Sequence, residues 1–434
     1  MEKEVILAHI EAHKGEAERR ARLYDYYRGK HDILERKFDD PGKPNNRLCC
    51  GFPAMISNAY TGYVFGEPIS YTSGNAQLLE NTMGTVRYND EQAENCALGL
   101  DLSICGVAVE LHYTDADAME RFKRVDPIGC IDVRDDSIEE NLTTLIRYYD
   151  VTDVLTGKAV RRVEVYEAEE NVFYEERNGA LVETARVQNV YRDVPAVVYR
   201  NNSERMGDFE SVITLIDAYD LMQSESLNDQ QYFSDAYLVL KNMLGTTDEE
   251  IARLKRNRVL LTPEDGDAGF LIKQQSDTIA ENVKNRLNND IHRFSGCPDM
   301  TDQNFAGNAS GVAIRYKILQ FENIASVKER EFKRGLQRRF ELLCNIWDVK
   351  GRGMFDWRDL QISFRRALPQ NLLEVAQTLS ELGGVISDET KRAQLPMDID
   401  EEIEKQRILD QRKESMSLYQ TPEGYEELMD DGVE

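Results

Sequence analysis

The sequence predicts an α+β fold in which a β-rich region precedes a pair of helices and one very long helix. Between residues 47 and 200, short runs that alternate apolar and polar side chains are typical of strands. After residue 208, apolar positions recur instead at helical spacing. The chain has 434 residues, 41% of them hydrophobic, which is enough apolar material for a core and several cooperating units.

The first predicted element is a helix over "EKEVILAHIEAHKGEAERRARLYDYY", residues 2–27. Apolar and aromatic side chains such as Ile6, Ile10 and Leu23 recur there at helical spacing. Gly29 is suited to end the helix. The following "DDPGKPNN", residues 39–46, is typical of a turn or an arm.

Short strands are predicted next, as parts of a twisted sheet. "TGK" and "RNGA" supply hairpin turns between some of them. The candidate strands are "GVAVELHY" (106–113), "LTTLIRYYDV" (142–151), "RVEVYEAEENVFYEE" (162–176) and "PAVVYR" (195–200).

Two amphipathic helices follow, over residues 208–233 and 277–294, with a small α/β insert between them. Such a pair forms a stalk that carries the insert at its tip. The insert is predicted to contain the strands "AYLVLKN" (236–242), "RVLLT" (258–262) and "GFLIKQ" (269–274), and the short helix "TTDEEIARLKRN" (246–257).

After the second helix comes a polar loop, and then the longest predicted helix, from residue 310 to about 347. At about 1.5 Å per residue this helix would span about 55 Å. It carries eight Lys or Arg against four Glu, unlike the acidic chain as a whole, and Gly335 is expected to bend it. The chain from residue 368 is predicted to be helical and acidic, with a net charge of −9 over residues 398–434.

Charge and cysteine content exclude several classes of function. The formal net charge is −26, which argues against the basic patches that hold nucleic acid non-specifically. Seven scattered cysteines without a C-x-x-C pair favour a reducing cytosol and argue against a disulfide framework or a zinc site. We expect no membrane span, because no run reaches the roughly 18–20 apolar residues needed, and the N-terminal residues lack the pattern of a signal peptide.

The motifs do not predict an enzyme. "GNASG" (307–311) resembles a nucleophile elbow, but its serine is one place too late and no strand precedes it, so a helix N-cap at Asn308 or Ser310 is the better interpretation. His9 and His13 lack a third metal ligand, so two solvated histidines are expected there. We therefore predict no catalytic residue, no metal and no cofactor.

Four blocks together resemble a known family. They are "YYRGKHDILERK" (26–37), "KPNNRL" (43–48), "NAYTGYVFGEPISY" (58–71) and "FSGCPDMTDQNFAGNASGVAIRYKILQFE" (294–322). In this order and spacing they closely resemble the portal proteins of tailed bacteriophages, of the type found in long-tailed phages of Gram-positive bacteria and related prophages. The resemblance covers nearly the whole chain and is weakest after about residue 368.

The resemblance implies a ring, usually dodecameric, at one vertex of the capsid. Double-stranded DNA would be pumped through its channel by terminase and later ejected, and the ring would connect head to tail through an adaptor. Capsid and scaffolding proteins would be further partners of a virion protein assembled in the host bacterial cytoplasm. The implied parts are an N-terminal helix and β-rich wing (1–205), stem helix 1 (206–233), a clip (234–276), stem helix 2 (277–296), a tunnel loop (297–309), a spine helix and wing (310–367), and a helical acidic crown and tail (368–434).

The resemblance also assigns candidate residues. The tunnel loop is expected to touch phosphates without gripping them, through small, polar or acidic side chains and one bulky Phe. Its candidates are Asp299, Thr301, Asp302, Gln303, Asn304, Phe305, Gly307 and Asn308. Acidic stem residues would keep the duplex centred, or would alternatively face solvent outside the ring. These candidates are Asp217, Asp220, Glu225 and Asp229.

The basic spine helix leaves two interpretations open. Arg330, Arg334 and Arg338 would pair with the neighbouring subunit, or would form pairs within the helix of the Glu329–Lys333 kind. Two other functions also stay open for the whole chain, an acidic hydrolase and a partner-binding structural protein that forms no ring. Self-association separates the ring from both alternatives.

Overall fold

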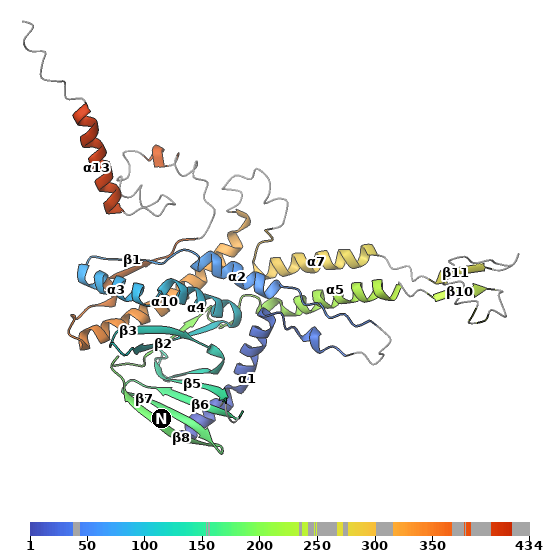
Figure 1. Cartoon of the computed structure of the whole chain (residues 1–434), viewed down its shortest axis with the longest axis horizontal. Helices are drawn as coiled ribbons and strands as arrows, with labels where there is room; N and C mark the ends of the chain where they lie inside the picture. Colours follow the sequence, from blue (N-terminus) through green and yellow to red (C-terminus); the bar gives the residue numbers. More distant parts are fainter. Residues whose placement is uncertain are drawn as a thin grey trace, which may run out of the picture. The chain divides into compact units, whose positions relative to one another are not determined.

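The structure is a computed structural model, and it divides into two compact units, residues 1–367 and 368–434 (Figure 1). Each unit is described by itself. The described residues are 1–37, 44–152, 154, 157–233, 237–241, 247, 249, 267–271, 277–300, 316–366, 377, 379–382 and 401–418.

Helices dominate the first 105 residues. α1 (Lys3–Tyr27) agrees with the predicted N-terminal helix, and Gly29 follows it with a φ of 77°. α2 (Phe52–Phe65), α3 (Ala76–Tyr88) and α4 (Glu91–Cys105) come next. The prediction of a β-like texture beginning near residue 47 is therefore wrong for this stretch.

Burial of polar side chains explains why these helices were missed. α4 buries Glu91, Glu94, Asn95 and Asp101 along with its leucines, so apolar and polar residues do not separate onto opposite faces. A helix that is enclosed on several sides lacks the one-sided apolar pattern from which helices are recognised in a sequence.

Two antiparallel sheets form the β-rich part. The larger has the strand order β4–β5–β6–β7–β8 and the smaller the order β3–β2–β9. The strands of the larger sheet are β4 (Cys130–Arg134), β5 (Leu142–Thr152), β6 (Ala159–Tyr166), β7 (Glu170–Arg177) and β8 (Ala180–Gln188). The strands of the smaller sheet are β2 (Val107–Thr114), β3 (Glu120–Val125) and β9 (Ala196–Arg200). Apart from these two sheets, β1 (Ser70–Ser73) pairs with β12 (Leu360–Ser363).

The predicted strands at 106–113, 142–151 and 195–200 are confirmed to within one residue at each end. The run 162–176 is instead divided between β6 and β7. The turn predicted at "RNGA" is confirmed, since Asn178 and Gly179 both have positive φ, 53° and 77°, as a tight hairpin between twisted strands requires.

The larger sheet is covered on both faces. Ile6 and Ile10 of α1 pack against one face, which presents Ile146, Val163 and Val165. Leu145 and Tyr166 point to the other face, where they join side chains of the smaller sheet. That second cluster contains Val107, Val109, Leu111, Cys130, Leu145, Tyr166, Val194 and Ala196.

α10 (Leu319–Val349) is the long helix, and its 31 residues span about 46 Å. It ends two residues beyond the predicted end, whereas its predicted start at residue 310 lies outside the described residues. Gly335 has a packing role in it: a Cβ there would lie 2.1 Å from Cδ1 of Tyr199. Glycine is needed because the Tyr199 ring of β9 lies directly against the α10 backbone.

The stalk predicted from the sequence consists of α5 (Ile213–Phe233), which follows the short 3-10 turn Glu210–Val212, and α7 (Asp277–Ser295). The two helices lie side by side (Figure 1). Between them in the chain, β10 (Tyr237–Lys241) and β11 (Asp267–Leu271) form an antiparallel hairpin.

Other predicted parts of the insert and the tail are described only in part. Most of the predicted helix at 246–257 and the strand at 258–262 lie outside the described residues. The second unit contains α13 (Glu401–Leu418), in the region where the sequence predicts helices.

Candidate functional site

The predicted stem acids are engaged by the N-terminal part of the chain. Asp220 has no exposed surface, and its carboxylate accepts from the backbone N–H of Cys50 at 2.7 Å and lies 2.5 Å from Nδ1 of His31. A carboxylate enclosed in this way cannot face a channel in this conformation. Asp220 is therefore removed from the candidates for the channel lining.

The neighbouring acids are also bound within the chain. The hydroxyl of Tyr26 donates to Asp217 at 2.7 Å, and Glu225 forms an ion pair with Arg36. Asp229 is partly exposed, and it too interacts with another group. The acidic side of α5 therefore binds residues near the end of α1, which the helical period of α5 alone could not indicate.

A regular ladder of hydrogen bonds continues this contact along the helix. We call residues 46–50 the strap. The backbone N–H groups of Asn46, Leu48 and Cys50 donate in turn to side chains of α5. Their acceptors are Asn228 at 2.8 Å, Ser224 at 2.9 Å and Asp220 at 2.7 Å.

The spacing of the ladder follows from the geometry of the two segments. Two residues of extended chain advance about 6.6 Å, and four residues of helix advance about 6 Å. Every second strap residue therefore meets every fourth residue of α5, with the two segments antiparallel. The strap includes the second half of the block "KPNNRL", in which the side chain of Asn46 also donates to Asn228, at 2.8 Å.

His31 joins the strap region to α1. Its ring stacks on Tyr26 with centroids 4.6 Å apart, and its Nε2 lies 3.1 Å from the backbone oxygen of Tyr26. Because Nδ1 contacts Asp220, one buried imidazole bridges the end of α1 and the middle of α5. Sequence reasoning missed this residue, because its partner lies 189 positions away.

The start of the predicted tunnel loop is firmly anchored. The hydroxyl of Tyr60 in α2 donates to the backbone oxygen of Ser295 at 2.9 Å. Gly296 follows with a φ of 70°, and a Cβ there would lie 2.5 Å from Ile324 of α10. Of the loop candidates, Asp299 is partly exposed. The others lie outside the described residues: Thr301, Asp302, Gln303, Asn304, Phe305, Gly307 and Asn308.

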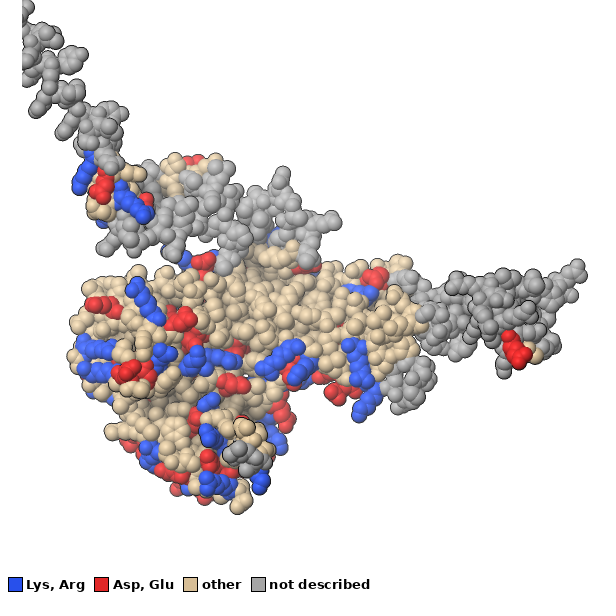
Figure 2. All heavy atoms as spheres, in the orientation of Figure 1, with Lys and Arg blue, Asp and Glu red and all other residues tan. Residues whose placement is uncertain are grey.

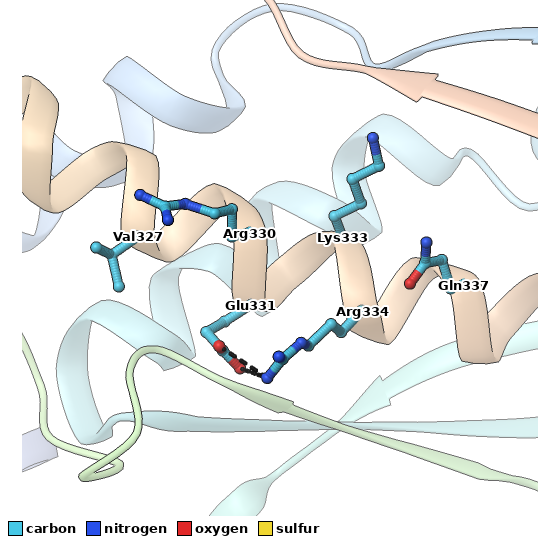
Figure 3. A pocket seen from close by; sticks show the side chains of 6 residues that line it. All are labelled: Val327, Arg330, Glu331, Lys333, Arg334 and Gln337. Carbon is cyan, nitrogen blue, oxygen red and sulfur yellow. Dashed lines mark hydrogen bonds and ion pairs between the residues drawn. The ribbon is translucent and has the colours of Figure 1, made fainter.

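Two of the cationic candidates of α10, Arg330 and Arg334, lie along a hollow of about 320 Å³ (Figure 3). The side chain of Arg334 is 75% exposed and pairs with Glu331 at 3.1 Å, and Lys333 points away from this pair. The hollow is lined by Val327, Arg330, Glu331, Lys333, Arg334 and Gln337.

The expected Glu329–Lys333 pair is replaced by contacts with the segment after α10. Glu329 pairs with Arg366 at 2.7 Å, and Lys333 donates to the backbone oxygen of Ile362 at 3.1 Å. Arg338 pairs with Asp193 at 2.7 Å and with Glu341 at 2.8 Å, while Arg330 donates to the backbone oxygen of Ser326 at 3.2 Å. Pairs within the chain therefore form, although not the predicted one.

Two of the eight basic residues counted in this helix are in the core. Lys328 is fully buried and pairs with Asp208 at 2.5 Å. Arg339 is also fully buried and lies 2.5 Å from both Glu91 and Glu110. Burial opposes ionisation of Glu110, but the charge and hydrogen bonds of Arg339 together with the contact to His112 outweigh it and hold the pKa of that carboxyl at about 2.

These buried pairs reduce the basic surface that the sequence predicts for α10. Over the face shown in Figure 2, Lys and Arg side chains are interleaved with Asp and Glu. Nowhere on that face does a broad patch of one sign appear. Mixed charge of this kind suits protein contact better than a tight grip on nucleic acid.

The described residues contain no group of three or more His, Cys, Asp or Glu placed to hold a metal ion. His13 is not a solvated residue as predicted: its Nδ1 lies 3.0 Å from the Tyr148 hydroxyl, and the ring is partly buried. Among the described helices, none is both long and apolar enough to cross a membrane.

Comparison with known proteins finds relatives that match most of the chain. The portal protein of Bacillus phage SPP1 is 25% identical over 421 residues, which cover 92% of this chain and 82% of that protein. The portal protein of Clostridium phage phiCD119 is 25% identical over 415 residues, covering 89% and 91% respectively. The model of the family described as "Phage portal protein, SPP1 Gp6-like" matches residues 7–418. Since this match spans nearly the whole length, the chain belongs to the SPP1 Gp6-like family of phage portal proteins.

Proposed function

We propose that copies of this chain form a closed ring, dodecameric as is usual for the family, at one vertex of a phage capsid. Double-stranded DNA passes through the central channel, driven inward by a terminase during packaging and released through the same ring during ejection. The ring also serves as the docking platform between head and tail, in contact with an adaptor and with capsid and scaffolding proteins. It is assembled in the host bacterial cytoplasm.

The observation that carries this proposal is the extent of the family match, residues 7–418. The match spans the residues that form the sheets, α5, α7, the hairpin between them and α10. Portal proteins are structural components of the virion rather than enzymes. The wing, stem, clip, tunnel loop, spine and crown assignments made from the sequence are retained as part of the proposal.

In this proposal, residues 297–309 reach toward the axis of the ring. The hydrogen bond from the hydroxyl of Tyr60 to the backbone oxygen of Ser295, just before the loop, supports this role. Because the residues before the loop are held in place, its small polar side chains can contact phosphates while the stem keeps its position. Uncharged donors contact phosphates without displacing the counterions that a cationic grip would release.

The cationic face of α10 is proposed to meet the next subunit. A cyclic ring requires two different patches on each copy, because its contacts are heterologous. Arg330, Arg334 and Arg338 supply one patch. Arg334 supports the idea best, because its guanidinium is largely exposed even while paired with Glu331.

The experiment is native mass spectrometry with negative-stain imaging of the purified chain, at low and at high salt. Rings of about twelve copies with a central hole are the expected result. A discrete dimer with a closed interface would contradict the proposal, since a two-fold contact leaves no patch for ring growth. If the chain is monomeric, the same imaging on particles assembled with capsid protein decides the question.

A further inference from the structure

The two stem helices differ in charge and in what covers them. α5 contains four Asp or Glu and no Lys or Arg. Asp217 accepts from Tyr26, and Glu225 pairs with Arg36. Asp220 contacts both His31 and the strap. α7 contains equal numbers of acidic and basic residues. The acids of the stem are thus largely committed to contacts within the chain.

α7 carries an exposed polar stripe with a different composition. Thr278, Asn282, Asn285, Asn289 and Arg293 follow one another at spacings of four, three, four and four residues, which places them on one helical face. Arg286 borders this face. All six side chains are exposed, and none of the six is a carboxylate. We call these six residues the amide stripe.

The stripe is available for a ligand. Within the described part of the chain, the amides of Asn282, Asn285 and Asn289 make no side-chain hydrogen bond. Arg286 has an 85% exposed side chain and is 4.0 Å from Asp290, the outer limit of an ion pair. The guanidinium of Arg293 lies 6.0 Å from the centroid of the Phe294 ring, a weak contact at an exposed site.

The direction of the chain gives the stripe a place in the proposed ring. α7 ends at Ser295, and residues 296–300 lead directly into the loop that is proposed to face the channel. α5 is connected instead to the strap and to α1. Of the two stem helices, α7 is therefore the one that is continuous with the channel side.

We propose that the amide stripe of α7, rather than the acidic side of α5, is the surface of the stem that contacts the phosphates of double-stranded DNA. This inference rests on the proposed channel function. Amide and hydroxyl groups donate to phosphate oxygens without neutralising them, so they release no counterions and hold the duplex weakly. Arg286 and Arg293, about 10 Å apart along the helix, add two charged contacts per copy.

The composition of the stripe therefore suits sliding. Each phosphate neutralised by a cation adds to the salt dependence of binding, so a surface lined with arginine alone would hold the duplex in place. A surface of carboxylates would repel it. A surface of neutral donors with two arginines is therefore expected to hold the duplex more weakly than arginine alone, without the repulsion that carboxylates would cause.

The test is site-specific photo-crosslinking in DNA-filled heads assembled with the full-length chain. p-Benzoylphenylalanine is placed at Asn285 or Asn289 and, as a matched control, at Thr214, an exposed residue of α5. A fourth position, Phe305, reports on the tunnel loop. We expect DNA crosslinks at Asn285 and Asn289 to exceed those at Thr214 at least fivefold.

Crosslinks to DNA at Phe305 or Thr214 but not at Asn285 and Asn289 would overturn this inference and leave the channel function standing. Crosslinks from Asn285 to a second copy of the chain, without DNA, would also overturn it, because the stripe would then be a subunit contact. The absence of DNA crosslinks at all four positions would contradict the channel function itself.

A second set of variants tests charge without a bulky probe. Replacing Asn282, Asn285 and Asn289 together by Asp adds three negative charges per copy at nearly constant volume. We expect packaged DNA per head to fall severalfold, whereas Thr214→Asp leaves it unchanged. Circular dichroism of each purified variant checks that α7 still folds, and unchanged packaging by a folded triple variant would refute the proposal.

Discussion

The backbone N–H of Leu48 donates to the hydroxyl of Ser224, 176 residues away, at 2.9 Å. This bond is the middle rung of the ladder between the strap and α5. It shows that α5 is held along one side by a segment from near the N-terminus.

Ser224→Ala is expected to lower the free energy of unfolding by about 1 kcal/mol, because the part-buried N–H of Leu48 loses its acceptor. Amide hydrogen exchange at Leu48 should accelerate at the same time. The control is Ser226→Ala on the same helix, whose hydroxyl donates only to the backbone oxygen of Met222, within α5. Equal effects of the two substitutions would argue against a stabilising strap.

Asp220→Asn is expected to cost more, about 3 kcal/mol, because it leaves the buried His31 without its charged partner. The amide oxygen can still accept from Cys50, so the strap itself is retained. Urea denaturation gives the difference. Asp217→Asn is the comparison, since Asp217 is partly exposed and accepts only from a tyrosine hydroxyl, and its effect should be well below that of Asp220→Asn.

Stability should depend on pH through His13. Burial, and secondly the Arg20 charge, lower the pKa of His13 from 6.5 to about 4. Between these values the unfolded chain binds a proton that the folded chain refuses, so folding stability falls as the pH is lowered from 6.5 and the loss is complete near 4. His13→Gln should flatten this part of the profile of unfolding free energy against pH. A profile identical to that of the unmodified chain would contradict the assignment.

Gly335→Ala is expected to destabilise the protein by about 1–3 kcal/mol, because the new methyl group overlaps the buried ring of Tyr199. Gly84→Ala in α3 is a matched control, since a Cβ at Gly84 meets nothing within 4 Å. That control should stabilise by about 0.5–1 kcal/mol through helix propensity. Thermal melts of the two variants should therefore shift in opposite directions.

Arg334→Glu is expected to weaken assembly without unfolding the chain, because the side chain is largely exposed. In a ring the substitution acts at every interface at once. Arg358→Glu, with a similarly exposed side chain at 74%, is the control. Rings of unchanged number and salt resistance, seen by native mass spectrometry for Arg334→Glu, would exclude the proposed contact.

Much of the fold could be predicted because its elements follow their own periodicity. α1, α5 and α7, and the strands near residues 107, 142 and 196, each show a local pattern of apolar side chains. α4 could not be recognised, since it buries Glu91 and Asp101 as well as leucines. A local pattern of apolar side chains indicates whether a segment is a helix or a strand. Whether a charged side chain is buried depends instead on partners elsewhere in the chain.

The same limit applies to the candidate site. The acids of α5 could be located from the sequence, but not their partners, because His31 and Cys50 lie 189 and 170 residues from Asp220. Counting charges on α10 likewise could not distinguish the exposed Arg334 from the buried Arg339. The amide stripe attracts little attention in a sequence, since asparagines carry no charge and belong to no motif.

The ladder between residues 46–50 and α5 has a consequence for synthesis on the ribosome. Asn46 emerges long before its partner Asn228, and at about 5–20 residues per second the interval is about 10–35 s. During this time the segment has no helix to bind, and water hydrates the backbone N–H groups that will later donate to α5. Because Asn228 lies about halfway along the 434 residues, the ladder can close only after α5 is complete, whereas contacts that need α10, such as the pair of Arg339 with Glu91, form later still.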